Sequence, residues 1–218
     1  MARRTSSAST RERLLDAAEA LFAEAGFNGA SLRPITEQAG ANLAAVNYHF
    51  GSKEALYEAV VLRRIRPMNE ARLQRLAEAE RIGPDVIDLR LLLDLLLRPI
   101  VALATAPTPG GHPFPRVISR ALIDPEPFMR SVMTREFSPL FRRLEPHLRR
   151  LLPELDRPTL GFRLRYVLGA TNMIFAANPF LPGLRPSLPT ASAPDVLLEQ
   201  LLVVSEAVLR APPPALTS

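Results

Sequence analysis

Residues 40–56 read GANLAAVNYHFGSKEAL, and this segment gives the strongest structural signal in the chain. Gly40 is free to adopt the positive φ that a tight turn between two helices requires. Asn42 is suited to cap the helix that follows, because its side-chain oxygen can accept a backbone N–H. Small alanines on both sides of the turn allow two helices to approach closely. The segment therefore predicts the turn and the second helix of a helix-turn-helix.

The residues before Gly40 supply the first helix of this motif. Ser31 is a helix-start signal, and Leu32 and Ile35 then fall on one helical face. We expect Ile35 to pack against Val46 across the motif as its buried pair. Such a motif presents its second helix to the major groove of duplex DNA.

The whole chain has helical periodicity, and no segment alternates apolar and polar residues as a half-buried strand would. Caps, glycines and prolines set the expected boundaries. We predict an all-α fold whose helices span residues 9–26, 31–40, 42–50, 53–81, 85–106, 113–123, 126–152, 159–180 and 194–209. Prolines inside these spans, at 67, 99, 139 and 146, are expected to kink or split their helices.

The composition excludes several classes of protein. The chain has 218 residues, 47% of them hydrophobic, and no cysteine, which rules out disulfides, thiolate catalysis and cysteine metal sites. Its net charge of +5 favours a polyanionic partner, although the excess is modest. No apolar run resembles a signal peptide or an uninterrupted membrane span. We expect no membrane association and a location in a reducing cytoplasm.

Residues 40–56, together with ALFAEAGF at 20–27, resemble the TetR family of bacterial transcriptional regulators. The resemblance covers about residues 9–65, and the remainder is similar only in being all-helical. The chain departs from the family at two places. Thr36 stands where the family most often has alanine, and Pro34 biases Arg33 away from helical angles. Both departures concern the first helix of the motif and leave its turn intact.

The composition of the two ends and the resemblance together predict a division of the chain into four parts. A flexible arm at 1–8 precedes a three-helix helix-turn-helix DNA-binding domain at 9–52. A larger helical domain for effector binding and dimerisation follows at 53–210, and a disordered tail at 211–218. The resemblance also implies a sequence-specific regulator, expected to be a repressor, that needs no cofactor.

Several side chains are candidates for contact with the DNA backbone. Tyr48 and His49 are similar to the family's phosphate-contacting pair. Lys53 stands at a helix N-terminus, where the helix dipole already favours an anion, and its ammonium would add a charge-assisted contact. Ser31 could both cap its helix and contact a phosphate.

Five side chains are candidates for reading base edges: Arg33, Leu43, Ala44, Ala45 and Asn47. Arginine can address guanine, asparagine can address adenine, and alanine can contact a thymine methyl group. Arg3 and Arg4 could enter a minor groove or belong to a solvated arm. Simpler explanations exist for three neighbours: Tyr48 and Phe50 as core aromatics, and His49 as an ordinary surface histidine.

The last two helices have wide apolar faces. In proteins similar to TetR such helices pair with their copies as a four-helix bundle, which implies a homodimer that binds a palindromic operator. Ordinary core packing is the alternative explanation.

Aromatic, sulfur-bearing and polar residues of the larger domain could line a pocket for a small apolar effector, of the fatty-acyl or xenobiotic class. The candidates are Phe114, Arg120, Met133, Phe137, Phe162, Tyr166, Asn172 and Met173. The same residues could form a packed core. In the first case effector binding would tilt the helix that begins at Lys53 and relieve operator binding.

Two other functions are alternatives to a ligand-responsive regulator. An enzyme is disfavoured because the three histidines have no catalytic or metal-binding pattern around them. A TetR-like protein with an architectural or recruiting role would have the same DNA-binding motif, no effector and a filled interior.

Overall fold

The computed structural model describes residues 9–106, 112–123, 126–175 and 194–212. These residues form nine α-helices, one short 3-10 helix and no strand, which confirms the all-α prediction. The helices are α1 (Thr10–Gly29), α2 (Leu32–Gln38), α3 (Leu43–His49), α4 (Lys53–Ile82), η1 (Pro84–Val86), α5 (Leu89–Ala104), α6 (Phe114–Ile123), α7 (Pro127–Leu151), α8 (Arg157–Phe175) and α9 (Pro194–Arg210).

Short polar side chains cap the N-termini of three helices, as predicted. The side-chain oxygens of Ser9, Asn42 and Ser52 each accept the backbone N–H three residues further on, at 3.3, 2.9 and 3.1 Å. Each bond satisfies one of the backbone donors that a helix leaves free at its start. These caps determine where α1, α3 and α4 begin.

Two expected boundaries are wrong by more than two residues. The fifth helix begins at Leu89 and not at residue 85, because residues 84–86 form the 3-10 turn and Asp88 caps α5 by accepting Leu91 N–H at 2.7 Å. The first helix continues to Gly29, although Gly26 has a φ of 74° and interrupts its regular geometry. A single turn therefore follows the glycine that was expected to end the helix.

The prolines of α7 do not split it, since the helix is assigned continuously through Pro139 and Pro146. The expected end of the eighth helix at 176–180 and the arm at 1–8 lie outside the described residues. Of the tail expected from residue 211, Ala211 and Pro212 are described, and their carbonyl oxygens accept hydrogen bonds from the buried Arg163.

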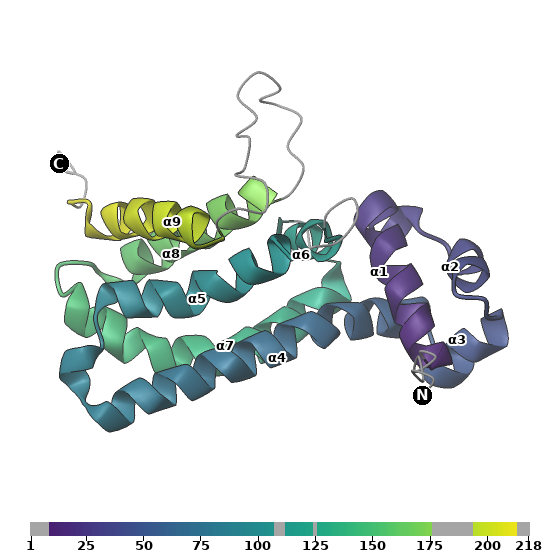
Figure 1. Ribbon diagram of the computed structural model, residues 1–218, viewed down its shortest axis with the longest axis horizontal. Coiled ribbons are helices and arrows are strands. Elements are labelled where there is room, and N and C mark those ends of the chain that lie inside the picture. Colours follow the sequence, from purple (N-terminus) through teal and green to yellow (C-terminus); the bar gives the residue numbers. More distant parts are fainter. Residues whose placement is uncertain (1–8, 107–111, 124–125, 176–193, 213–218) are drawn as a thin grey trace, which may run out of the picture.

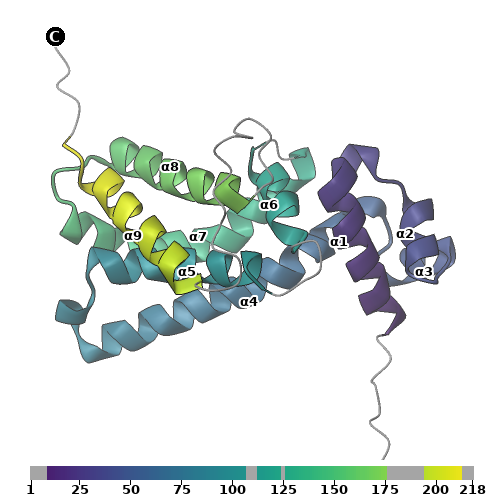
Figure 2. The ribbon, with the colours of Figure 1, turned by 45° about the horizontal axis from the view of Figure 1, so that its top comes forward.

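The helices are arranged as a small cluster joined to a longer bundle (Figures 1 and 2). Helices α1, α2 and α3 form the cluster at one end of the molecule. Helix α4 leaves this cluster and extends along the length of the bundle, where it packs against α7 and α5. Helix α5 in turn packs against α9, and α8 packs against both α6 and α9.

Two apolar cores hold this arrangement together. The first includes Phe22, Ile35 and Val46 of the cluster, and also the first half of α4, helix α6 and the start of α7. The second lies inside the bundle, between α4, α5, α7, α8 and α9. Because the first core extends past residue 52, the cluster is packed directly against α6 and α7. A shift of α6 or α7 would therefore change the packing of the cluster.

Candidate nucleic-acid interface and internal cavity

The turn between α2 and α3 has the geometry that its sequence predicts. Gly40 has a φ of 58°, and a Cβ at this position would meet nothing within 4 Å. The backbone N–H of Ala41 donates to the carbonyl of Thr36 at 2.9 Å and closes the turn. Ile35 and Val46 are both fully buried, as expected of the pair that holds the two helices together.

The departure at Thr36 is accommodated within α2. Its hydroxyl is buried and donates to the carbonyl oxygen of Arg33 at 2.8 Å, so no polar group is left unpaired. Pro34 lies in the first turn of the helix, where no N–H is required. Since α2 begins at Leu32, Arg33 is helical despite the proline after it.

Helix α3 presents a row of side chains to solvent. Tyr48 is 85% exposed and Leu43 52% exposed, and Ala44 and Asn47 are exposed beside them. His49 is half-buried, with its ring 5.0 Å from that of Tyr48. The exposure of Tyr48 is incompatible with its alternative explanation as a core aromatic.

The candidate Ala45 and the predicted core aromatic Phe50 face the protein interior in part. Ala45 and Phe50 are half-buried and pack against the first core. Arg11 of α1 lies over the Phe50 ring, with its guanidinium carbon 5.4 Å from the centroid. Phe50 is thus a packing residue that joins α1 to the end of α3, and Ala45 has only part of its surface available to a ligand.

The two candidates on α2 are exposed. Ser31 occupies the N-cap position, but its side chain makes no capping hydrogen bond, so the predicted cap is wrong. Its hydroxyl remains accessible. Arg33 is exposed and pairs with Glu37, one helical turn away, at 3.1 Å. An exposed ion pair of this kind is weak, so the guanidinium can leave it for a stronger partner.

Lys53 lies where the sequence predicts it, at the first position of α4. Its Nζ is 4.6 Å from the centroid of the Phe27 ring, which holds the ammonium at the edge of the cluster. The Ser52 hydroxyl satisfies the N–H of Ala55, and the Glu54 backbone N–H donates to its own carboxylate, which lowers the pKa of that carboxyl. An anion beside Lys53 would meet the ammonium and the positive end of the helix dipole.

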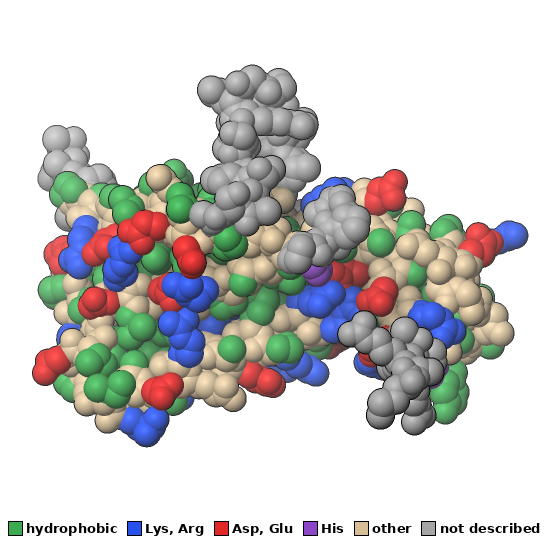
Figure 3. Space-filling view, in the orientation of Figure 1, with side chains coloured by type: hydrophobic (Ala, Val, Ile, Leu, Met, Phe, Trp, Pro, Cys, Tyr) green, Lys and Arg blue, Asp and Glu red, His purple; other side chains and the backbone are tan. Residues whose placement is uncertain are grey.

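A buried carboxylate that was not predicted fixes α1 against α4. Glu19 is 2% exposed and accepts hydrogen bonds from Arg63 and Arg64 of α4. The Nδ1 atom of His112, just before α6, lies 3.5 Å from the same carboxylate. Figure 3 shows acidic and basic side chains together beside a histidine where α1 meets the bundle. The available signal was an acidic residue on the apolar face of α1.

A cavity of about 500 Å³, partly open to solvent, lies between α4, α5, α6, α7 and α8. Four of the predicted pocket residues line it: Phe114, Met133, Phe137 and Asn172. The rest of its wall is also mainly apolar, and comprises Ile65, Met68, Arg72, Leu96, Ile100, Leu103, Pro115, Ile118, Leu122, Thr134, Phe141, Arg165, Leu168 and Gly169.

The other four predicted pocket residues do not line this cavity. Phe162, Tyr166 and Met173 project from α8 toward solvent and are 66%, 56% and 39% exposed. We call these three residues the outer α8 face. Arg120 extends toward α1 instead, where it donates to the carbonyl of Glu24 at 3.2 Å. Helical periodicity places Phe162, Tyr166 and Met173 together, but it does not determine which face of α8 is inward.

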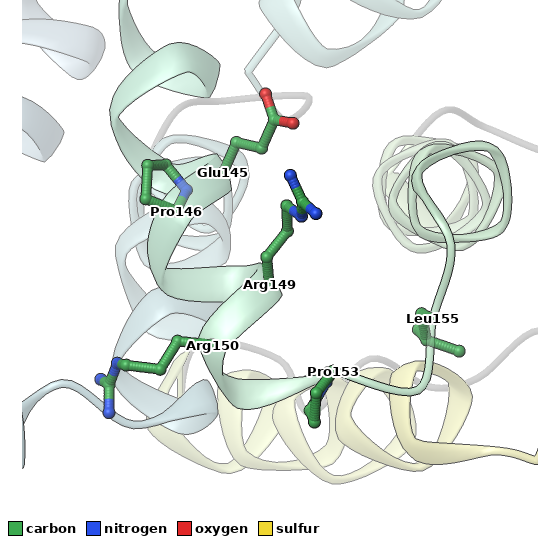
Figure 4. A pocket seen from close by; sticks show the side chains of 6 residues that line it. All are labelled: Glu145, Pro146, Arg149, Arg150, Pro153 and Leu155. Carbon is green, nitrogen blue, oxygen red and sulfur yellow. The ribbon is translucent and has the colours of Figure 1, made fainter.

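A second hollow, of about 510 Å³, lies where α7 ends, and its wall includes Glu145, Arg149, Arg150 and Pro153 (Figure 4). Arg150 is already used in the fold, since it donates to the carbonyls of Pro84 and Ile87 at 3.1 and 2.7 Å. We assign no ligand to this hollow.

The described residues lack two other kinds of site. They contain no group of histidine and acidic side chains able to hold a metal ion. None of their helices combines the length and apolar character needed to cross a membrane.

An exposed helix held by a buried apolar pair, joined to a helical bundle with a cavity, defines the class of helix-turn-helix regulators. Residues 14–60 match the model of the bacterial regulatory proteins of the tetR family. Residues 94–207, more than half of the chain, match the Tetracyclin repressor-like C-terminal domain. The chain belongs to the TetR family of DNA-binding transcriptional regulators, which is not an enzyme family.

The HTH-type transcriptional dual regulator CecR of Shigella flexneri is 34% identical over 146 residues. This match covers 65% of the present chain and 62% of CecR, so less than two thirds of that relative is matched.

Solved structures show the same fold. The fatty acid degradation regulator FadR of Bacillus halodurans is 15% identical and superposes with a TM-score of 0.65, covering 95% of this chain and 98% of FadR. FadR of Bacillus subtilis, in complex with stearoyl-CoA, is 16% identical with a TM-score of 0.58, covering 91% of this chain and 95% of that one.

Proposed function

We propose that this protein is a sequence-specific repressor that binds a palindromic operator as a homodimer and releases it when a small apolar effector binds. The observation that supports this most directly is the exposed face of α3. Tyr48 is 85% exposed, whereas Val46, two residues earlier on the same helix, is fully buried. Residues 9–52 would bind DNA, residues 53–210 would bind the effector and the second protomer, and the protein would act on the chromosome in a bacterial cytoplasm.

The nine predicted DNA contacts keep their proposed roles. Ser31, Tyr48, His49 and Lys53 would contact phosphates and so fix the position of α3 in the major groove. The base edges would be read by Arg33, Leu43, Ala44, Ala45 and Asn47, among which Ala45 has the least accessible surface.

The proposed dimer uses α8 and α9. Both helices expose large apolar side chains. The outer α8 face is one such group, and on α9 Val196, Val203 and Val204 are each more than half exposed. Large apolar side chains gathered on one surface favour burial against another protein surface. Operator binding by such a dimer requires its two α3 helices to lie on one side of the duplex, about 34–36 Å apart, in successive major grooves.

The cavity supports an effector rather than a purely architectural role. Its volume of about 500 Å³ lies within the range of small-molecule sites, whereas the architectural alternative predicts a filled interior. Three of its wall residues, Ile65, Met68 and Arg72, belong to α4, the helix that begins at Lys53. A ligand that repacks this wall would therefore act on the helix that joins the cavity to the DNA-binding cluster.

Selection of bound sequences from random duplex DNA by the full-length protein tests the proposal. We expect recovery of an inverted repeat whose half-sites are about one helical turn apart. The recovered operator is then titrated in the presence of candidate apolar effectors. Recovery of no preferred sequence would contradict operator recognition, and an affinity unchanged by every effector would contradict the release mechanism alone.

A further inference from the structure

Arg72 is a buried cation without a counter-charge. Its side chain is 4% exposed and forms part of the cavity wall. Burial lowers the pKa of the guanidinium to about 10, which leaves it charged near neutral pH. No carboxylate of the described residues lies within 4.0 Å of it. The acid on the adjacent helix, Asp94, is instead paired with Arg75 and Arg98.

Hydrogen bonds within the fold explain part of this arrangement. Arg72 donates through Nε to the carbonyl of Leu95 at 3.2 Å and through Nη2 to that of Leu96 at 2.6 Å. Pro99 has no N–H, so the Leu95 carbonyl lacks its usual helical donor, and Arg72 supplies one. A neutral amide could supply that bond equally well. The hydrogen bond to the Leu95 carbonyl therefore does not explain why the residue is positively charged.

The fold does not use all the hydrogen-bond donors of Arg72. A guanidinium has five N–H groups, and a third bond, from Nη1 to Oδ1 of Asn69 at 2.9 Å, leaves two without an acceptor in the described residues. The cavity wall includes a second arginine, the exposed Arg165, and no acidic residue. The interior of this site is therefore apolar, with uncompensated positive charge.

On the basis of the proposed effector function, we propose that the ligand of this cavity is an anionic amphiphile, with an apolar body and one carboxylate, and that the carboxylate pairs with Arg72. A carboxylate has the planar geometry that fits two adjacent guanidinium N–H groups. Pairing offsets the cost of burying the cation, and a neutral or cationic ligand offers no such gain. The apolar body contacts Phe114, Phe137 and Phe141.

The alternative place for an acidic group is the rim of the cavity, beside Arg165. This arginine is exposed, so water already solvates it and a carboxylate gains little there. The two arginines thus distinguish a ligand whose acid is inside the protein from one whose acid remains in solvent.

Calorimetric titration of the DNA-free, full-length protein with dodecanoate and dodecan-1-ol tests the proposal. These probes have the same apolar chain and differ in charge. We expect dodecanoate to bind roughly 10- to 100-fold more tightly, the contribution of a charged hydrogen-bonded pair. Arg72→Gln should remove this preference, so that the ratio of the two affinities falls to about one. Arg165→Gln, which removes the same charge at the rim, should retain it.

Several results would overturn the proposal. They are equal affinity of the wild type for both probes, absence of binding of either, a preference that survives Arg72→Gln, or one lost in Arg165→Gln. If Arg72→Gln loses both probes because its cavity collapses, Arg72→Lys decides, since it must retain the preference for dodecanoate. The assay contains no DNA, so its failure is distinct from failure of operator binding or release, which gel-shift titration of the wild type measures separately.

Discussion

At the scale of single residues, the contribution of Lys53 can be isolated because it is the only lysine of the chain. We predict that Lys53→Ala weakens binding to every DNA sequence and lowers the salt dependence of log K by about 0.9 for each bound protomer. The physical reason is the loss of one phosphate contact and of the counterion that it displaces. Measurement of operator and random-sequence affinity over a range of salt concentrations checks this.

Arg81→Ala is the matched control, since Arg81 is an exposed cation in the last turn of the same helix. It makes the same change in net charge far from α3 and should leave the salt slope unchanged. An equal effect of the two substitutions would show that Lys53 acts only through the net charge of the protein.

A second prediction concerns the buried Tyr57, which is 3% exposed. Burial raises the pKa of Tyr57 to about 12, so between about pH 10 and 12 the folded protein retains a proton that the unfolded chain releases. Stability should therefore fall as pH rises through this range. Tyr57→Phe should reduce that fall, and Tyr48→Phe, at an exposed site, should not. Chemical unfolding at a series of alkaline pH values measures the difference, and identical profiles would contradict the prediction.

Some residue roles could be predicted from the sequence, and others could not. The exposed Tyr48 and the buried Val46 follow from helical spacing within a recognisable motif. Arg72 was missed because α4 is rich in arginine and glutamate, which are usually solvated. Its spacing from Ile65 and Leu76 places it on the buried face of the helix, and this was the available signal. Whether a counter-charge faces such a residue depends on other helices, which sequence spacing does not reveal.

At the scale of elements, the turn between α2 and α3 depends on the backbone of Gly40. We predict that Gly40→Ala destabilises the protein by about 1–2 kcal/mol, the cost of a left-handed conformation for a residue with a Cβ. No steric term contributes, since the new Cβ would meet nothing within 4 Å. Urea unfolding measures the change.

Gly161→Ala provides the opposite case. Gly161 lies within α8, also with nothing within 4 Å of an added Cβ, and has no positive φ. Alanine there should stabilise the protein by roughly 0.5–1 kcal/mol, because it favours the helix. If both substitutions changed stability in the same direction, backbone conformation would not explain the Gly40 result.

Helix positions were predicted well where a polar cap marks the start. Ser9, Asn42 and Ser52 are such caps, and the helices that they begin start where expected. The orientation of α8 was not predictable, because apolar residues occupy both of its faces. Leu160 and Val167 are buried, whereas Phe162 and Tyr166 are exposed on the other side. Periodicity identifies the two faces, and only the packing of neighbouring helices determines which one meets the cavity.

At the scale of the whole molecule, the proposed dimer gives a further prediction. Tyr166→Arg places a charge in the outer α8 face and should convert the protein to a monomer with much weaker operator binding, since a single half-site contact remains. Sedimentation velocity and operator titration measure the two effects. Ile82→Arg is the control, because Ile82 is 69% exposed at the far end of α4. A dimer that persists in Tyr166→Arg would exclude this face as the interface.

Helix α8 contributes Leu168 and Asn172 to the wall of the cavity and also bears the exposed Phe162 and Tyr166. In the proposed dimer, one helix alone would separate each cavity from the neighbouring protomer. Filling the first cavity would then alter the second by repacking the shared helical layer. Ligand saturation of the assembled protein should follow a curve whose Hill coefficient differs from one, and disruption of the dimer should return that coefficient to one.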